Sequence, residues 1–247
     1  MVNGYDILEY GPAPCAVNIV VGHYGAGKTN FSLNWSFDLA RQGKNVTLVD
    51  FDVVNPYFRS SDYSAMLADA GVAVIAPNLA GSSLDNPSIS GSVGTAISQA
   101  YEQWAQGECS SVLVIDVGGD DAGATVLGRF ASEAAQGSYQ MLYVVNQYRN
   151  LTREPEEALE IMEEIQVKSG LRVTGVVNNS HLRDQTDAST VVDALDFGRA
   201  CAVAAGVDLV CTTVPKMSFE QINKAFSQEE QGVTLYPVSM LVRTPWE

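Results

Sequence analysis

Positively charged residues are scarce in this sequence. Lysine and arginine together number 14 against 29 aspartates and glutamates, which gives a formal net charge of −15 at pH 7. Non-specific binding to nucleic acid or anionic lipid depends on lysine and arginine side chains that neutralise phosphate groups. The composition therefore argues against nucleic acid and a bare membrane surface as partners.

Long apolar runs and clustered cysteines are also missing. No stretch approaches the ~20 apolar residues that a membrane-spanning helix needs. Residues 1–6 carry no basic segment of the kind that begins a secretion signal. The cysteines lack metal-ligand spacing and are interpreted as buried reduced thiols: Cys15, Cys109, Cys201 and Cys211. We therefore expect a soluble cytoplasmic protein with no direct membrane anchor.

The 247 residues, 46% of them hydrophobic, are enough for one α/β domain over residues 1–247. Short β-branched runs alternate with longer helix-like stretches, as in βα units on a parallel sheet. Strands are expected near 16–21, 45–50, 72–76, 111–116, 140–146, 172–178 and 208–214. Helices are expected near 28–42, 60–70, 93–106, 122–135, 153–169, 188–206 and 218–229. The sequence predicts a three-layer, doubly wound, mostly parallel sheet of about seven strands.

Two segments depart from this alternation. Residues 78–94, NLAGSSLDNPSISGSVG, are rich in Gly, Ser, Asn and Pro and predict a long loop, either functional or merely mobile. The tail 234–247 is expected to be extended rather than helical. Helices are expected to end at four glycines that suit the left-handed C-cap position: Gly43, Gly71, Gly107 and Gly170.

A glycine-rich motif follows the first predicted strand. GHYGAGKT, at residues 22–29, matches G-x-x-x-x-G-K-[ST] between a strand and a helix, a context that a chance glycine-rich turn lacks. Its backbone N–H groups and the helix N-terminus suit phosphate oxygens. Lys28 is predicted to reach the β- and γ-phosphates and Thr29 to ligate Mg²⁺. The predicted phosphate-binding set is Gly22, His23, Tyr24, Gly25, Ala26, Gly27, Lys28, Thr29 and Asn30.

Carboxylates follow two other predicted strands. VTLV runs into Asp50 and Asp52, and VLVI runs into Asp116, Gly118 and Gly119. Both groups fall at the carboxyl ends of parallel strands, where open α/β sheets bind ligands. Asp116 has a Walker B pattern and is assigned to Mg²⁺, through a bound water. The alternative is that Asp116 is a solvated strand end. The two glycines are predicted to act as a switch beside the γ-phosphate.

These motifs resemble, in their order, the MinD/ParA-like P-loop ATPases, a group that includes the CobB/CobQ-type nucleotide-binding domains. The matching pieces are GHYGAGKT, VTLVDFD and VLVIDVGG, all in the first half. In that family the second acid of the D-x-D element, here Asp52, orients the hydrolytic water, and the first, here Asp50, lies near the metal. The resemblance implies a P-loop NTPase fold, ATP and Mg²⁺ as cofactors, and Lys28 and Asp52 as catalytic residues.

The same resemblance implies an adenine site in the second half. Asn178 and Asn179 end one predicted strand and Pro215 ends another, at places where family members contact the base. The alternative is that the two asparagines only cap a turn. A GTP site would require an N/T-K-x-D element, and neither residues 146–149 nor residues 178–181 supply one. ATP is therefore favoured.

One departure from the family concerns charge. Members that dimerise around the nucleotide carry an extra lysine in a K-G-G-x-G-K pattern, where this sequence has His23 and Tyr24. Histidine would substitute only when protonated, and an unperturbed imidazole is mostly neutral at pH 7. Arg59 is another candidate cation for the γ-phosphate, in cis or in trans, unless it is a surface arginine at a helix start. A homodimer is an open alternative, but the missing lysine argues against hydrolysis that depends on dimerisation.

Two functions fit these residues. The favoured one is a slow ATPase that acts as a switch or regulator of an unidentified protein partner. The alternative is an ATP-dependent ligase or synthetase of the dethiobiotin-synthetase or CobB/CobQ type, which activates a small-molecule carboxylic acid and uses the 78–94 loop as its pocket. The missing cysteine pair argues against a metal-cluster carrier, and the charge argues against a DNA-partitioning role.

Overall fold

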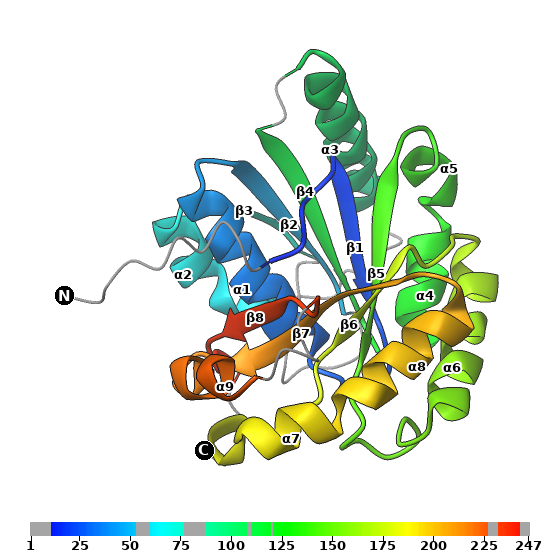
Figure 1. The fold of residues 1–247 in the computed structure, drawn as a ribbon. Helices are drawn as coiled ribbons and strands as arrows, with labels where there is room; N and C mark the ends of the chain where they lie inside the picture. The colour runs from blue at the N-terminus through cyan, green and yellow to red at the C-terminus, as the bar shows by residue number, and fades with distance from the viewer. Residues whose placement is uncertain are drawn as a thin grey trace.

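The computed structural model contains one parallel sheet with helices on both faces (Figure 1). It describes residues 11–52, 60–76, 87–107, 110–119, 121–226 and 232–242. The strand order is β3-β2-β4-β1-β5-β6-β7-β8, and every neighbouring pair is parallel. The strands are β1 (Val17–Val21), β2 (Asn45–Phe51), β3 (Ala73–Ile75), β4 (Ser111–Val117), β5 (Tyr139–Val145), β6 (Gly175–Asn178), β7 (Asp208–Pro215) and β8 (Leu235–Val238).

The helices form the outer two layers. They are α1 (Lys28–Arg41), α2 (Ser64–Asp69), α3 (Pro87–Ala105), α4 (Asp121–Gly128), α5 (Ala131–Ala134), α6 (Pro155–Ser169), α7 (Ala188–Asp193), α8 (Leu195–Ala205) and α9 (Phe219–Ala225), with short 3₁₀ turns η2 (Ser60–Tyr63) and η3 (Arg183–Gln185). Side chains of α1 and α2 pack on one face of the sheet, and those of α3, α4, α5, α6 and α8 pack on the other. The three-layer α/β prediction is confirmed. None of the described helices is long and apolar enough to cross a lipid bilayer.

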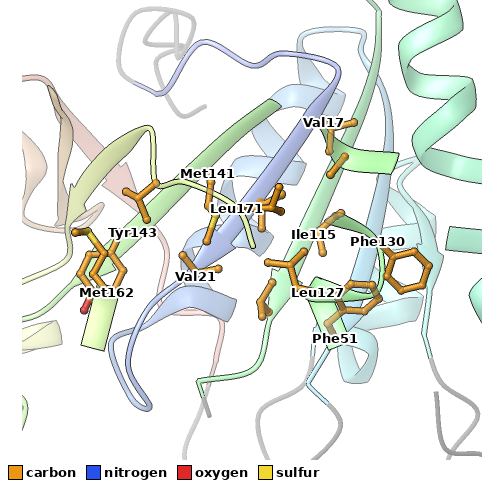
Figure 2. Close-up of a cluster of buried hydrophobic side chains, with 14 of the residues drawn as sticks. Val17, Val21, Phe51, Ile115, Leu127, Phe130, Met141, Tyr143, Met162 and Leu171 are labelled. Atoms are coloured by element: carbon orange, nitrogen blue, oxygen red, sulfur yellow. The ribbon is translucent and has the colours of Figure 1, made fainter. Parts of the chain in front are cut away.

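Strand alternation decides which side chains face which layer. On β4, Leu113 and Ile115 pack toward α3 and α4, whereas Val112 and Val114 pack toward α1. Figure 2 shows the first of these clusters, where the rings of Phe51 and Phe130 stack 5.5 Å apart. Burying each such aromatic or aliphatic side chain contributes about 1.5–3 kcal/mol. This packing fixes the strand ends that carry the predicted site.

One predicted loop is partly wrong, and the sheet has one strand more than the seven segments expected. The additional strand, β8, lies in the predicted extended tail and pairs with β7. Residues 87–94 of the predicted 78–94 loop belong to α3, and residues 77–86 lie outside the described residues. Proline is well suited to a first helical turn because that turn needs no N–H donor. The helix then buries Val93, Ile97 and Ala100 at helical spacing, which outweighs its glycines.

Two predicted helices are each divided. The 122–135 segment forms α4 and α5, and the 188–206 segment forms α7 and α8. Helix α4 ends at Gly128, where a Cβ would lie 2.7 Å from the backbone oxygen of Lys168 on α6. This close approach lets α4 and α6 pack against each other. The four glycines predicted to end helices, Gly43, Gly71, Gly107 and Gly170, all have positive φ, as predicted.

Candidate functional site

The predicted catalytic motifs meet at the carboxyl ends of three adjacent strands. The loop 22–29 follows β1, Asp52 follows β2, and Gly118 and Gly119 follow β4. These strands are neighbours in the order β2-β4-β1, and Asp50 and Asp116 are paired in register on β2 and β4. Asp50 and Asp116 lie on the same strand faces as Leu48 and Val114, which pack toward α1, so their carboxylates face the helix that follows the glycine-rich loop.

Glycine is required at several positions of the 22–29 loop. Gly22, Gly25 and Gly27 have φ values of 151°, 75° and 97°, a region that other residues rarely adopt. A Cβ on Gly22 would collide with the backbone oxygen of Val144, and one on Gly27 would collide with the amide of Asn179. Gly27 is also the N-cap of α1 and supplies no side-chain cap. The first N–H groups of α1 thus remain suited to an anionic ligand.

The cation at this site is Lys28. Its side chain is only 7% exposed, and its Nζ donates to the backbone oxygen of His23 across the loop at 3.0 Å. Burial, followed by the nearby charge of Lys28, lowers the pKa of His23 below its usual 6.5. His23 is therefore neutral at pH 7 and does not replace the positive charge of the lysine found here in some family members.

Asp116 is a buried carboxylate with one unsatisfied oxygen. The Oγ of Ser32 donates to its Oδ1 at 3.2 Å, whereas its buried Oδ2 has no hydrogen-bond partner in the structure. Burial and the adjacent Asp50 raise the pKa of Asp116 to about 7, although Lys28 and hydrogen bonds from Thr29 and Ser32 oppose the shift. Two neighbouring buried carboxylates are better accommodated when a cation is present.

These oxygens fit Mg²⁺. Mg²⁺ prefers carboxylate, hydroxyl and water oxygens and is usually completed by substrate phosphates. Thr29, Asp50 and Asp116 supply such groups at the start of α1 and at the paired strand ends, and the unsatisfied Oδ2 of Asp116 could accept from a metal-bound water. Among the described residues no group of three or more His, Cys, Asp or Glu side chains is arranged to hold a metal ion.

The pKa of Asp116 predicts a pH-dependent stability difference. A folded-state pKa of about 7 against 3.8 for the unfolded chain means that protonated Asp116 stabilises the fold fully below about pH 4. This contribution is lost as the pH rises through about 7. We expect Asp116→Asn to melt at a higher temperature than wild type at about pH 8 without ligands, and to melt closer to wild type at about pH 5.

Thermal unfolding of both proteins across this pH range measures the difference, with Asp208→Asn as a control at an exposed strand start. Mg-nucleotide should remove the alkaline advantage of Asp116→Asn by stabilising wild type selectively. A melting-temperature difference that does not vary with pH would contradict the raised pKa.

The two glycines after β4, which were predicted to act as a switch, pack against the loop and against Asp52. A Cβ on Gly119 would lie 2.6 Å from the Nζ of Lys28 and 2.7 Å from the backbone of Tyr24. A Cβ on Gly118 would lie 3.4 Å from Oδ1 of Asp52. The segment after Asp116 thus touches both the lysine and the second acid of the D-x-D element, and the approach at Gly119 leaves no room for a side chain.

The predicted base-contacting residues are separated by the structure. The amide of Asn178 donates to the backbone oxygen of Ala194 at 3.0 Å, because strand alternation turns it toward α8. Asn179 faces the glycine-rich loop, and its amide donates to the backbone oxygen of Ala26 at 2.7 Å. Pro215 lies at the buried end of β7 and is not among the described residues that line the cavity beside the loop. Asn179 therefore secures the loop to β6.

A cavity of about 300 Å³ lies beside the glycine-rich loop, and we call the part of it next to Lys28 its phosphate end. We call the whole cavity the nucleotide cavity. Its lining includes five residues that were predicted to belong to the nucleotide site, namely Lys28, Thr29, Asp52, Gly119 and Asn179. It also includes six residues that the sequence analysis did not identify: Asn146, Arg149, His181, Arg183, Met240 and Val242. The last two follow β8, and the other four lie on the loops after β5 and β6.

His181 is a neutral donor that lines the nucleotide cavity from the loop after β6. Burial, then Arg183 and Arg149, lower its pKa to about 4. Its Nδ1 accepts from the backbone N–H of Arg183 at 3.2 Å, which leaves the proton of the neutral ring on Nε2. Nε2 is buried and has no hydrogen-bond partner. Arg183 itself has a φ of 55°, a rare conformation for this residue type that is most often found at functional sites.

A second, larger cavity of about 740 Å³ lies between α4 and α6 and opens onto the same loop. We call it the α4–α6 groove. It is lined by His23, Tyr24, Gly119, Asp121, Ala124, Leu151, Glu157, Glu160, Ile161, Glu164, Ile165 and Lys168. The side chains of Asp121 and Lys168 form an ion pair across it. Tyr24 and Gly119 line both cavities, so the groove and the nucleotide cavity share a wall.

Two of the predicted features fall outside the described residues. Arg59 belongs to residues 53–59, and Cys109 follows α3 in the 108–109 gap. The other three cysteines are unpaired thiols, and burial raises the pKa of each.

Comparison with protein families gives one match. The model of the CobQ/CobB/MinD/ParA nucleotide binding domain matches residues 19–190. This range includes the glycine-rich loop, both carboxylate-bearing strand ends and the loops after β5 and β6. No curated protein gives a significant match to the sequence.

Solved structures of similar fold include FtsY and signal recognition particle proteins. The cell division protein FtsY from Thermotoga maritima has 17% identity and a TM-score of 0.51, with 83% of this chain and 64% of that chain covered. FtsY from Mycoplasma mycoides has 15% identity and a TM-score of 0.56, with 89% and 67% covered. The 54 kDa signal recognition particle protein from Aeropyrum pernix, solved with GDP, has 13% identity and a TM-score of 0.51, with 83% and 43% covered. These likenesses show a P-loop NTPase-like fold.

Proposed function

Because the chain belongs to the CobQ/CobB/MinD/ParA family of P-loop nucleotide-binding proteins, we propose that it hydrolyses Mg-ATP slowly as a switch for a protein partner. Lys28 and the N–H groups of the loop bind the phosphates, and Asp52 orients the attacking water. Thr29, Asp50 and Asp116 would hold Mg²⁺, which would supply positive charge to the β- and γ-phosphates.

The observation that best supports a switch function is the wall that the two cavities share. Tyr24 and Gly119 face the phosphate end of the nucleotide cavity on one side and the α4–α6 groove on the other. Gly119 lies so near Lys28 and Tyr24 that a Cβ on it would clash with both, and we expect a γ-phosphate beside Lys28 to change this contact. That change reaches the α4–α6 groove directly, because Gly119 precedes α4 and lines the groove.

ATP is the nucleotide that the cavity lining favours. Guanine presents two N–H donors on its N1 and N2 edge and needs an acceptor, commonly a carboxylate, in the base site. Asp52 is the one carboxylate among the described residues that line the nucleotide cavity, and it lies with Lys28 at the phosphate end. The segments after β6 and β8 offer donors from His181 and Arg183 and apolar surface from Met240 and Val242. These groups suit the acceptor nitrogens and the face of adenine.

The ligase alternative is disfavoured by charge. A carboxylic acid that is to be activated by the γ-phosphate would enter beside Tyr24 and Gly119, through the α4–α6 groove. Four acidic side chains line that groove, and Lys168, its one lysine among the described residues, is already paired with Asp121. A negatively charged substrate would be repelled there. A partner with a basic contact surface fits this lining better.

Hydrogen exchange followed by mass spectrometry tests the switch. With Mg-AMPPNP in place of Mg-ADP, we expect exchange to change in residues 118–128 and 157–168, and to stay constant in α8 on the same face. Identical exchange in both nucleotide states would overturn the switch. ATP turnover measured alone and with a panel of small carboxylic acids tests the alternative, because strong stimulation by an acid would establish a synthetase instead.

A further inference from the structure

Arg149 lies on the loop after β5, and its side chain reaches the glycine-rich loop. A Cβ built on Gly25 would be 3.5 Å from the Nε of Arg149 and 3.7 Å from its Cζ. Arg149 also lines the nucleotide cavity together with Lys28 and Thr29. The guanidinium therefore faces the space in which the loop would hold a phosphate chain.

Hydrogen bonds fix the loop that carries Arg149. The backbone oxygen of the buried Asn146 accepts from the N–H of Arg149 at 3.2 Å and from the hydroxyl of Thr152 at 2.9 Å. Its side-chain oxygen accepts from the N–H of Tyr148 at 3.0 Å. The next residue, Gln147, donates its N–H to Ser180 on the neighbouring loop at 2.8 Å. This bonding places the Arg149 backbone before any ligand arrives, which lowers the entropic cost of using its side chain.

The guanidinium of Arg149 has no competing partner. Across the described ranges it forms neither an ion pair nor a hydrogen bond, although the chain has a large excess of carboxylates. An arginine with five free donors is well matched to phosphate oxygens, which it can bind in a bidentate manner. With His23 neutral, a polyphosphate in the loop would otherwise face Lys28 with little further positive charge from the 22–29 segment.

We propose that Arg149 is a phosphate-binding residue that contacts the nucleotide's phosphate chain from within the same chain. This inference rests on the proposed nucleotide site. Arg149 supplies this positive charge in cis, whereas some family members use a lysine at the position of His23. Arg149 lies on a different loop from that lysine, after the strand β5 that neighbours β1 in the sheet.

The test compares three variants with wild type by calorimetry, using Mg-ATP, Mg-ADP and Mg-GTP. Arg149→Ala removes the charge, Arg149→Lys keeps a single donor group, and Arg153→Ala is the matched control. Arg153 lies four residues further on, is exposed, and bonds to Asn150 outside the cavity. We expect Arg149→Ala to weaken binding by about tenfold to a hundredfold, the value of hydrogen bonds to charged groups. Arg149→Lys should recover part of this loss, and Arg153→Ala should match wild type.

The nucleotide panel separates phosphate contact from base contact. A phosphate contact predicts the same factor of loss for ATP and GTP, because their phosphate chains are identical. A loss confined to one base, or affinities of Arg149→Ala within twofold of wild type, would overturn the inference and leave the proposed function standing. If wild type and Arg153→Ala bound no nucleotide, the proposed function would fail as well.

Discussion

Lys28→Ala is expected to abolish measurable nucleotide binding, with affinity for Mg-ATP falling by at least about a hundredfold. Lys28 is the buried cation at the phosphate end of the cavity, and its Nζ is already positioned across the loop by the backbone oxygen of His23. Replacing it leaves Asp50 and Asp116 without their nearest positive charge, which raises the pKa of Asp116 further and weakens the attraction for phosphate.

Calorimetric titration with Mg-ATP measures this loss, and circular dichroism confirms that the variant is folded. Arg41→Ala provides a matched control, because Arg41 is an exposed cation at the opposite end of the same helix. Its affinity should equal that of wild type. An affinity of Lys28→Ala within a few-fold of wild type would contradict the assignment of residues 22–29 as the phosphate-binding loop.

Asp52→Ala is expected to keep nucleotide binding and lose hydrolysis by about a hundredfold or more, the typical contribution of a positioned general base or water-orienting group. Asp52 lines the nucleotide cavity, and its backbone N–H donates to Oδ1 of Asp50 at 2.9 Å. Its side chain lies against Gly118 of the switch segment. A carboxylate in this place can hold a water beside the γ-phosphate without contributing much to ground-state affinity.

Single-turnover hydrolysis and equilibrium binding, measured on the same preparation, separate these two effects. Asp52→Asn keeps the size of the side chain and should lose activity like Asp52→Ala, whereas Asp69→Asn, an exposed acid on α2, should behave like wild type. Wild-type turnover in both Asp52 variants would remove Asp52 from the mechanism. A parallel loss of binding and hydrolysis would show that Asp52 holds the nucleotide rather than the water.

The local parts of this protein were predictable. A strand, a glycine-rich loop and a helix succeed one another over residues 17–41, so pattern and spacing alone predicted the loop and the role of its glycines. Apolar runs predicted seven of the eight parallel strands and the places where Asp50 and Asp116 end two of them. The start of α3 at Pro87 was missed, because a composition rich in Gly, Ser and Pro indicated a loop and the burial of Val93 and Ile97 was not evident. The eighth strand was predicted only as an extended tail, because its pairing with β7 depends on the tertiary structure.

The sequence by itself therefore determined the family, the fold class and the positions of the glycine-rich loop and of the two carboxylate-bearing strand ends, since each depends on residues close together along the chain or on a fixed strand period. Only the tertiary structure placed Arg149 beside Gly25, because β5 is a neighbour of β1 in the sheet although more than 100 residues separate the two. It likewise turned Asn178 toward α8 and Asn179 toward the loop, since successive residues at a strand end face opposite layers. The groove between α4 and α6 arises only when two helices distant in sequence pack side by side.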